Sequence, residues 1–107
     1  MVRIVEEKCS FDKGKGIIVL ETDETDVHKA HDILLSINSK NLALEYAASK
    51  GLVPPRINGS IYGPYPVNKE GLDLAEAFEK YGTDLHSKFK VEKFRVSVPV
   101  CQGIIMM

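Results

Sequence analysis

The sequence lacks the long apolar stretches that membrane segments need. No run approaches the roughly 18 apolar residues that cross a bilayer. The N-terminal stretch 1–9 carries charges from Arg3 onward, where a secretory signal would have a continuous apolar core. These absences predict no membrane association, and they give the expectation of a cytoplasmic protein.

Cysteine is scarce, with only Cys9 and Cys101. Both are expected in strands near opposite ends of the chain, and the favoured interpretation is two small buried apolar side chains. If the first and last strands are neighbours, a disulfide becomes possible, which would indicate a redox role or a hyperthermophilic source. Two cysteines this far apart, with no third ligand nearby, do not make a zinc site, so no metal or cofactor is predicted.

The chain also has no excess of positive charge. Its net charge is −1 at pH 7, which argues against a nucleic-acid-binding protein that neutralises phosphates. The charges are nevertheless grouped, with four acids in segment 21–26 and four cations plus a histidine against one glutamate in segment 86–95. Solvated surface is the favoured interpretation of both groups. The alternative is attraction between subunits or a site for an anion.

Local catalytic motifs are missing. The sequence has no nucleophile elbow, no Cys-x-x-Cys, no His-Glu-x-x-His and no phosphate-binding P-loop. His28 and His31 stand three apart on a predicted helix, where both could face a metal, but no third ligand has a predictable position. A structural role is therefore favoured for this pair, and His86 is expected to be an exposed histidine.

What the sequence does contain is a β pattern at each end. Apolar residues alternate with other residues from Phe94 to Cys101, which predicts a half-buried strand. Segments 2–11 and 16–21 predict a hairpin, joined by a turn at 12–16 whose two glycines permit positive φ. The turn could alternatively cradle a phosphate. It lacks the spacing of the glycine-rich phosphate motifs, so a plain turn is favoured.

Apolar residues at helical spacing predict helices between these strands. The first helix is expected to be capped by Thr22, Asp23 or Thr25. The second is expected to start at Asn38 or Ser39 and to stop at Gly51. The third is expected to be capped by Asn68 and to be followed, after Gly82, by a short helix through Lys88. Residues 1–107 are therefore predicted to form one α+β domain. It is a two-layer sandwich in which two to three helices, in one layer, cover one face of a small, mostly antiparallel sheet made of the N-terminal hairpin and the C-terminal strand.

Segment 53–71 holds four of the five prolines and is unusually long for a connection inside a compact domain. A plain connection with ordered prolines is one interpretation, and a binding loop that contains a short strand is the other. The segment predicts a short edge strand around 56–62, followed by residues 63–66 on the surface. Its polar side chains make it a candidate binding loop. The basic region near Lys88 and Lys93 is expected to contribute to the same site. The candidate ligand-binding residues are Arg56, Asn58, Tyr62, Tyr65, His86 and Arg95.

These features predict a small homo-oligomeric binding or regulatory protein that holds a polar or anionic small molecule, or a partner protein, through segment 53–71. One alternative is a small enzyme with a site at a subunit boundary, where His86, His28 or His31 acts as acid or base. Another is a structural subunit of a larger complex. Self-association is expected because segment 104–107 is wholly apolar, so it should be buried in a neighbouring subunit or folded back on its own sheet.

Overall fold

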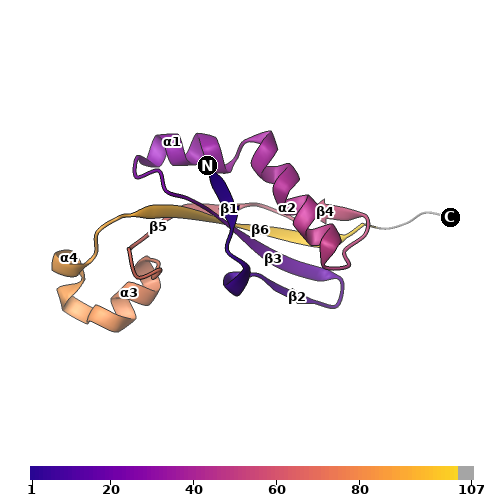
Figure 1. Cartoon of the computed structure of the whole chain (residues 1–107). Helices are drawn as coiled ribbons and strands as arrows, with labels where there is room; N and C mark the ends of the chain where they lie inside the picture. Colours follow the sequence, from indigo (N-terminus) through magenta and orange to yellow (C-terminus); the bar gives the residue numbers. More distant parts are fainter. Residues whose placement is uncertain (104–107) are drawn as a thin grey trace.

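A long antiparallel strand pair forms the centre of the sheet in the computed structural model, which describes residues 1–103. In this pair, β3 (Lys15–Thr22) lies beside β6 (Lys93–Gln102), and every residue of β3 has a partner in β6. The strands β1 (Val2–Ile4) and β2 (Ser10–Asp12) pair with the outer side of β3, and β4 (Pro55–Ile57) and β5 (Tyr62–Val67) with the outer side of β6. All pairs are antiparallel (Figure 1). The predicted hairpin and C-terminal strand are confirmed, with a short 3-10 turn, η1 (Glu6–Lys8), separating β1 from β2.

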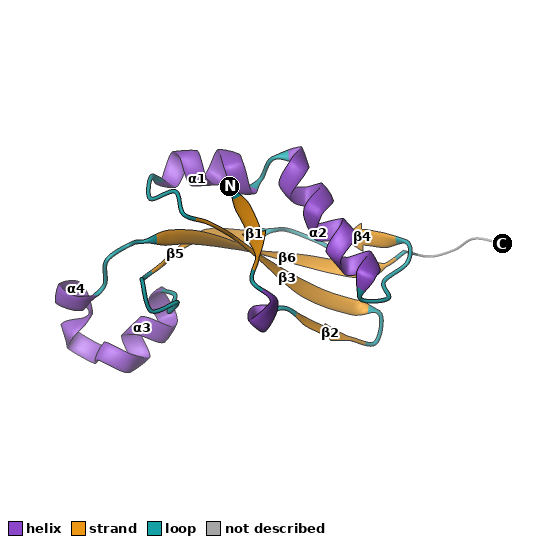
Figure 2. Ribbon diagram, in the orientation of Figure 1, coloured by secondary structure: helices purple, strands orange, loops and turns teal. Residues whose placement is uncertain are grey.

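Two helices, α1 (Val27–Leu34) and α2 (Ile37–Ser49), cover one face of this sheet (Figure 2). Every second side chain of β6 points toward these two helices, because successive residues of a strand face opposite sides of the sheet. The core contains Ile18, Leu20, Ala30, Leu34, Ala43, Ala47, Phe94, Val96, Val98 and Val100. The predicted α+β sandwich is therefore confirmed.

The remaining helices lie outside this layer. α3 (Leu74–Tyr81) and α4 (Leu85–Lys88) are on the other side of the sheet, near the end where β5 meets β6 (Figure 1). The sheet is therefore covered by two helices, within the two to three predicted, and α3 does not join that layer. Its Phe78 is 60% exposed. α3 is held instead by its buried Ala77, by a bridge between Val67 and Asp73, and by an ion pair of 2.8 Å between Lys8 and Glu76.

Segment 53–71 contains two strands where one was predicted. β4 covers Pro55–Ile57, and residues 63–66, which were expected on the surface, belong to β5. A strand with prolines at 64 and 66 cannot donate at those positions, so it cannot be central in a sheet. β5 tolerates them because it is an edge strand that pairs only with β6.

The helix breaks were predicted correctly, but the capping residues were not. α1 is capped by Asp26, α2 by Ser36 and α3 by Asp73. Thr22 is unsuited to capping α1 because it is the last residue of β3. Asn68 shapes the turn before α3, where its side-chain oxygen accepts the N–H groups of Glu70 and Leu72.

The cap of α1 gives a pH-dependent prediction. The Lys29 and His28 N–H groups donate to Asp26 Oδ1 at 3.1 and 2.9 Å, and these bonds hold the pKa of the Asp26 carboxyl below its usual value. Because the folded pKa is the lower one, the contribution of this carboxylate to stability is present above the unfolded value and is lost as the pH falls through the folded value. Asp26→Asn keeps a capping oxygen that does not titrate. Circular dichroism below about pH 4 should show a smaller acid-induced loss of helix in this variant, and a profile identical to the wild type would contradict the assignment.

The two thiols are not joined to each other. Cys9 Sγ donates to the Val5 carbonyl at 3.4 Å and accepts the Val19 N–H at 3.3 Å, and burial raises the pKa of the Cys9 thiol. Cys101 lies on β6 opposite Lys15. Both side chains are half-buried, close to the favoured interpretation of the sequence.

The interface predicted for segment 104–107 lies outside the described residues. Within the described part of the chain, no helix has both the length and the apolar character to cross a membrane.

Candidate functional site

The predicted ligand-binding residues fall in three separate places. Arg56 and Asn58 are at the β4 end of the sheet, Tyr62, Tyr65 and Arg95 are toward the other end, where β5 pairs with β6, and His86 is exposed on α4. Arg56 is opposite position 101 of β6, six residues along the strand from Arg95. At about 3.3 Å per residue this separation is roughly 20 Å. The six residues therefore do not form one small-molecule site.

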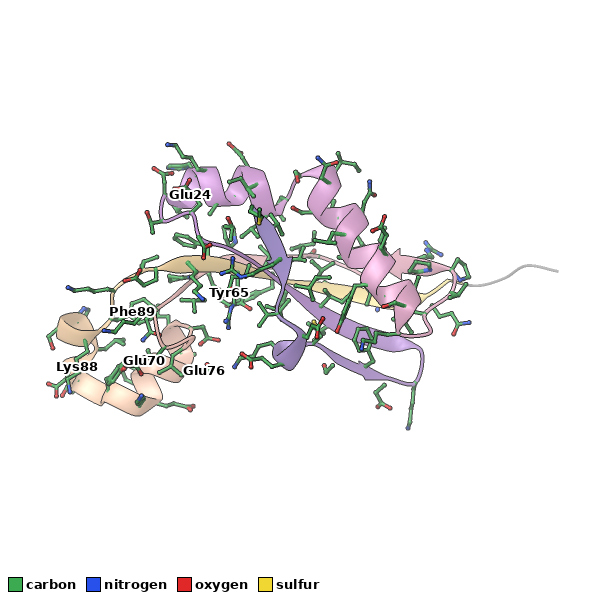
Figure 3. The ribbon with its side chains drawn as sticks, in the orientation of Figure 1. Glu24, Tyr65, Glu70, Glu76, Lys88 and Phe89 are labelled. Atoms are coloured by element: carbon green, nitrogen blue, oxygen red, sulfur yellow. The ribbon has the colours of Figure 1, made fainter. Side chains whose placement is uncertain are left out.

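The tyrosines form a small group between β5 and the start of α3. Their ring centroids are 5.6 Å apart, and Tyr65 Oη lies 3.2 Å from Ser97 Oγ. Burial raises the pKa of the Tyr65 phenol. In Figure 3 Tyr65 lies against the sheet, while Glu70 and Glu76 lie beside α3. The pocket here is about 190 Å³, enough for one small chemical group.

Arg95 already has a partner inside the protein. Its Nε donates to Glu21 Oε1 at 3.1 Å and its Nη1 donates to the Gly71 carbonyl at 3.2 Å. Glu21 also receives Arg3 Nε on its other oxygen at 2.7 Å. Both Glu21 and Arg95 are about 95% buried, at 4% and 5% exposure. This cluster orders the sheet, which leaves Arg95 less suited to hold a ligand than the sequence suggested.

A pocket whose described lining has cations and no acid lies at the opposite end of the sheet, and we call it the basic pocket. It is open and has a volume of about 690 Å³. Three segments far apart in the sequence meet here, namely the β2–β3 turn, β4 with the loop that follows it, and the end of β6. Its cationic side chains are Lys13, Lys15 and Arg56, with Asn58 beside them. Among the described residues that line it, there is no acid, no histidine and no aromatic side chain.

The register of the sheet explains why the cations converge. Lys15 and Arg56 are both paired with Cys101, one from each neighbouring strand. Side chains at paired positions point to the same face, and adjacent strands lie about 4.8 Å apart, so the two Cα atoms are roughly 10 Å apart with the thiol between them. That spacing allows a long lysine and a long arginine to reach one small anion from two sides.

The turn that carries Lys13 is under backbone strain. Asp12 pairs with Lys15, so the hairpin turn consists of Lys13 and Gly14 alone, with φ of 49° and 76°. Such turns usually have asparagine or glycine first, because positive φ costs other residues about 1–2 kcal/mol. Lys13 is the one non-glycine residue at positive φ in residues 1–103. Strain of this kind is concentrated at functional sites, and here the strained residue lines the basic pocket.

A glycine makes room for Arg56. A Cβ added to Gly103 would lie 2.9 Å from Arg56 Cδ and 3.0 Å from a ring carbon of Pro54. The Gly103 N–H donates to the Pro54 carbonyl at 2.6 Å, and the Asn58 N–H donates to the Pro99 carbonyl at 2.8 Å. The backbone on both sides of Arg56 is thus fixed to β6.

Sequence reasoning found Arg56 and Asn58 but favoured a plain turn at Lys13 and Lys15. The two lysines and two glycines of this turn do indicate a phosphate cradle as an alternative. What the sequence could not show is that β4 brings an arginine to the same turn.

Comparisons with known proteins do not assign this site. No protein-family model, curated protein or solved structure matches the chain. Within residues 1–103, no three His, Cys, Asp or Glu side chains are grouped closely enough to hold a metal ion.

The strained turn gives a prediction with two opposite effects. Lys13→Asn places a residue suited to positive φ at this position, so the free energy of unfolding should rise by about 1 kcal/mol. The same substitution removes a cation from the lining of the basic pocket, which should weaken the attraction of the pocket for any anion, with phosphate as the probe. Urea unfolding and a phosphate titration measure the two effects. Lys13→Gly is the control, since it also relieves the strain, and equal phosphate binding in the wild type and both variants would show that Lys13 has no role in the pocket.

Proposed function

We propose that this chain is a small binding or regulatory protein that takes an anionic small molecule in the basic pocket. The observation that carries the proposal is the convergence of Lys13, Lys15 and Arg56 on one pocket without a carboxylate in its described lining. Like charges held close together repel, and an anion between them removes that repulsion. Arginine adds specificity, because its guanidinium donates two parallel hydrogen bonds to one oxyanion.

The enzymatic alternative has no comparable support. A general base must lie within hydrogen-bonding reach of the group it deprotonates. His86 is on α4, beyond the opposite end of the sheet, and no histidine is among the described residues of the basic pocket (Figure 1). Binding is therefore the function that this geometry favours.

The experiment is thermal unfolding in inorganic phosphate against chloride at equal ionic strength. A ligand that binds only the folded state at 100 times its Kd stabilises that state by about 2.7 kcal/mol. We expect phosphate to raise the Tm of the wild type and to lose most of this effect in Arg56→Gln. Lys29→Gln, which removes an exposed lysine on α1, is the matched control and should keep the full shift. An equal shift in Arg56→Gln and the wild type would refute the proposed site.

Self-association is a separate proposal that rests on the apolar segment 104–107 of the sequence. Light scattering over a range of concentrations tests it. A monomer mass at every concentration would contradict it without affecting the basic pocket.

A further inference from the structure

We infer that the basic pocket selects a dianionic phosphoryl group, and that its ligand is a phosphate monoester without a nucleobase. This inference rests on the proposed function, since it names the chemical class of anion that the same pocket takes.

The first argument is charge. Lys13, Lys15 and Arg56 bring three positive charges to the pocket. The nearest carboxylate by register is Asp12, which is paired with Lys15 across the hairpin. Among the described residues, three cations and one neighbouring carboxylate leave two positive charges uncompensated. A carboxylate or sulfate ester neutralises one of them, whereas a phosphate monoester above its second pKa of about 6 neutralises both.

The second argument is the direction of the donors. Lys15 and Arg56 approach from the two sides of Cys101, Lys13 comes from the turn, and the Asn58 side chain can donate from the loop after β4. A carboxylate has two oxygens in one plane, while a phosphoryl group offers three strong acceptor oxygens arranged tetrahedrally. Donors that come from three segments match the tetrahedral group better.

The third argument concerns the rest of the ligand. A nucleobase gains about 1–3 kcal/mol from stacking on an aromatic side chain, and no described residue lining the pocket is aromatic. Phe11, on the adjoining strand β2, is already packed against Tyr46 of α2 at a centroid distance of 6.0 Å. Besides its cations, the lining includes the side chains of Gln102 and Asn58 and glycine backbone, which supply hydrogen-bonding groups for a short polar ligand.

The test compares methyl phosphate with methyl sulfate, which have nearly the same shape, at pH 5 and pH 7.5. Methyl sulfate stays a monoanion at both values, whereas methyl phosphate gains its second charge between them. Among residues 1–103, the titratable groups at the pocket are Lys13, Lys15, Arg56, Cys101 and Asp12, and none is a histidine, the side-chain type that usually titrates in this range. A change in affinity confined to methyl phosphate therefore reports the charge of the ligand.

We expect affinity for methyl phosphate, measured by NMR titration, to rise about tenfold from pH 5 to pH 7.5, since only about a tenth of it is dianionic at pH 5. Methyl sulfate should bind weakly at both values, and Arg56→Gln should weaken methyl phosphate binding while Lys29→Gln does not. Equal binding of the two esters, both lost in Arg56→Gln, would overturn the inference and leave the proposed function intact. Binding of neither ester would overturn both. Adenosine monophosphate binding more than tenfold tighter than methyl phosphate would overturn the exclusion of a nucleobase.

Discussion

Glu21→Leu is expected to cost about 3–5 kcal/mol of the free energy of unfolding, because removing one partner of a buried ion pair leaves the other charge buried and unpaired. Arg95 is that partner, with its Nε 3.1 Å from Glu21 Oε1 and a side chain that is 6% exposed. A domain of this size has about 5–15 kcal/mol of stability in total, so this single substitution should shift the urea midpoint strongly.

The control is to remove both charges together. Glu21→Leu with Arg95→Met replaces the pair by apolar side chains and should recover much of the loss, because no buried charge then remains unpaired. The other partners of Glu21 are Arg3 and Lys93, whose side chains are 40% and 28% exposed, and Arg3 keeps Asp23 at 2.7 Å. If the double variant is no more stable than Glu21→Leu, the cost does not come from an unpaired Arg95.

Gly63→Ala is the second substitution with a large expected effect. Gly63 has φ of 123°, which a residue with a Cβ adopts at a cost of about 1–3 kcal/mol. The added Cβ would also lie 2.8 Å from the Arg95 carbonyl oxygen of the neighbouring strand. Backbone cannot move aside as a flexible side chain can, so we expect about 1–3 kcal/mol more from this overlap.

Gly59 separates these two costs. Its φ is 102°, and a Cβ added there would meet nothing within 4 Å. Gly59→Ala should therefore show the backbone cost alone, and the difference between the two variants in urea unfolding measures the overlap with β6. Equal destabilisation of both variants would mean that the strand beside Gly63 yields to the methyl group.

Local patterns in the sequence were enough to predict whether most segments form a helix or a strand. The alternation from Phe94 to Cys101 predicted β6, with its valines facing the helices as observed. Segments 2–11 and 16–21 predicted a hairpin, and β2 and β3 form one. These predictions succeed because the alternation of side chains along a strand is a property of that strand alone and is visible in its own sequence.

The positions of elements that depend on contacts with distant parts of the chain were harder to predict. The apolar residues of α3 predict a helix but not which face of the sheet it contacts, and its Phe78 is exposed. The prolines at 64 and 66 predicted an irregular surface segment. They are accommodated in a strand because β5 lies at an edge of the sheet, and this position is decided by the rest of the fold. Neither fact is a property of the local sequence.

The sequence by itself determined the fold class, the strands near the two ends of the chain, and the presence of Arg56 and Asn58 as candidate binding residues. Only the tertiary structure decided which charges meet. The antiparallel register pairs Arg95 with Glu21, where the arginine is buried in an ion pair, and places Arg56 and Lys15 on either side of Cys101, where the cations remain available. The physical reason is that a shift of one residue in strand pairing moves every side chain to the opposite face, and register depends on long-range contacts that no short segment contains.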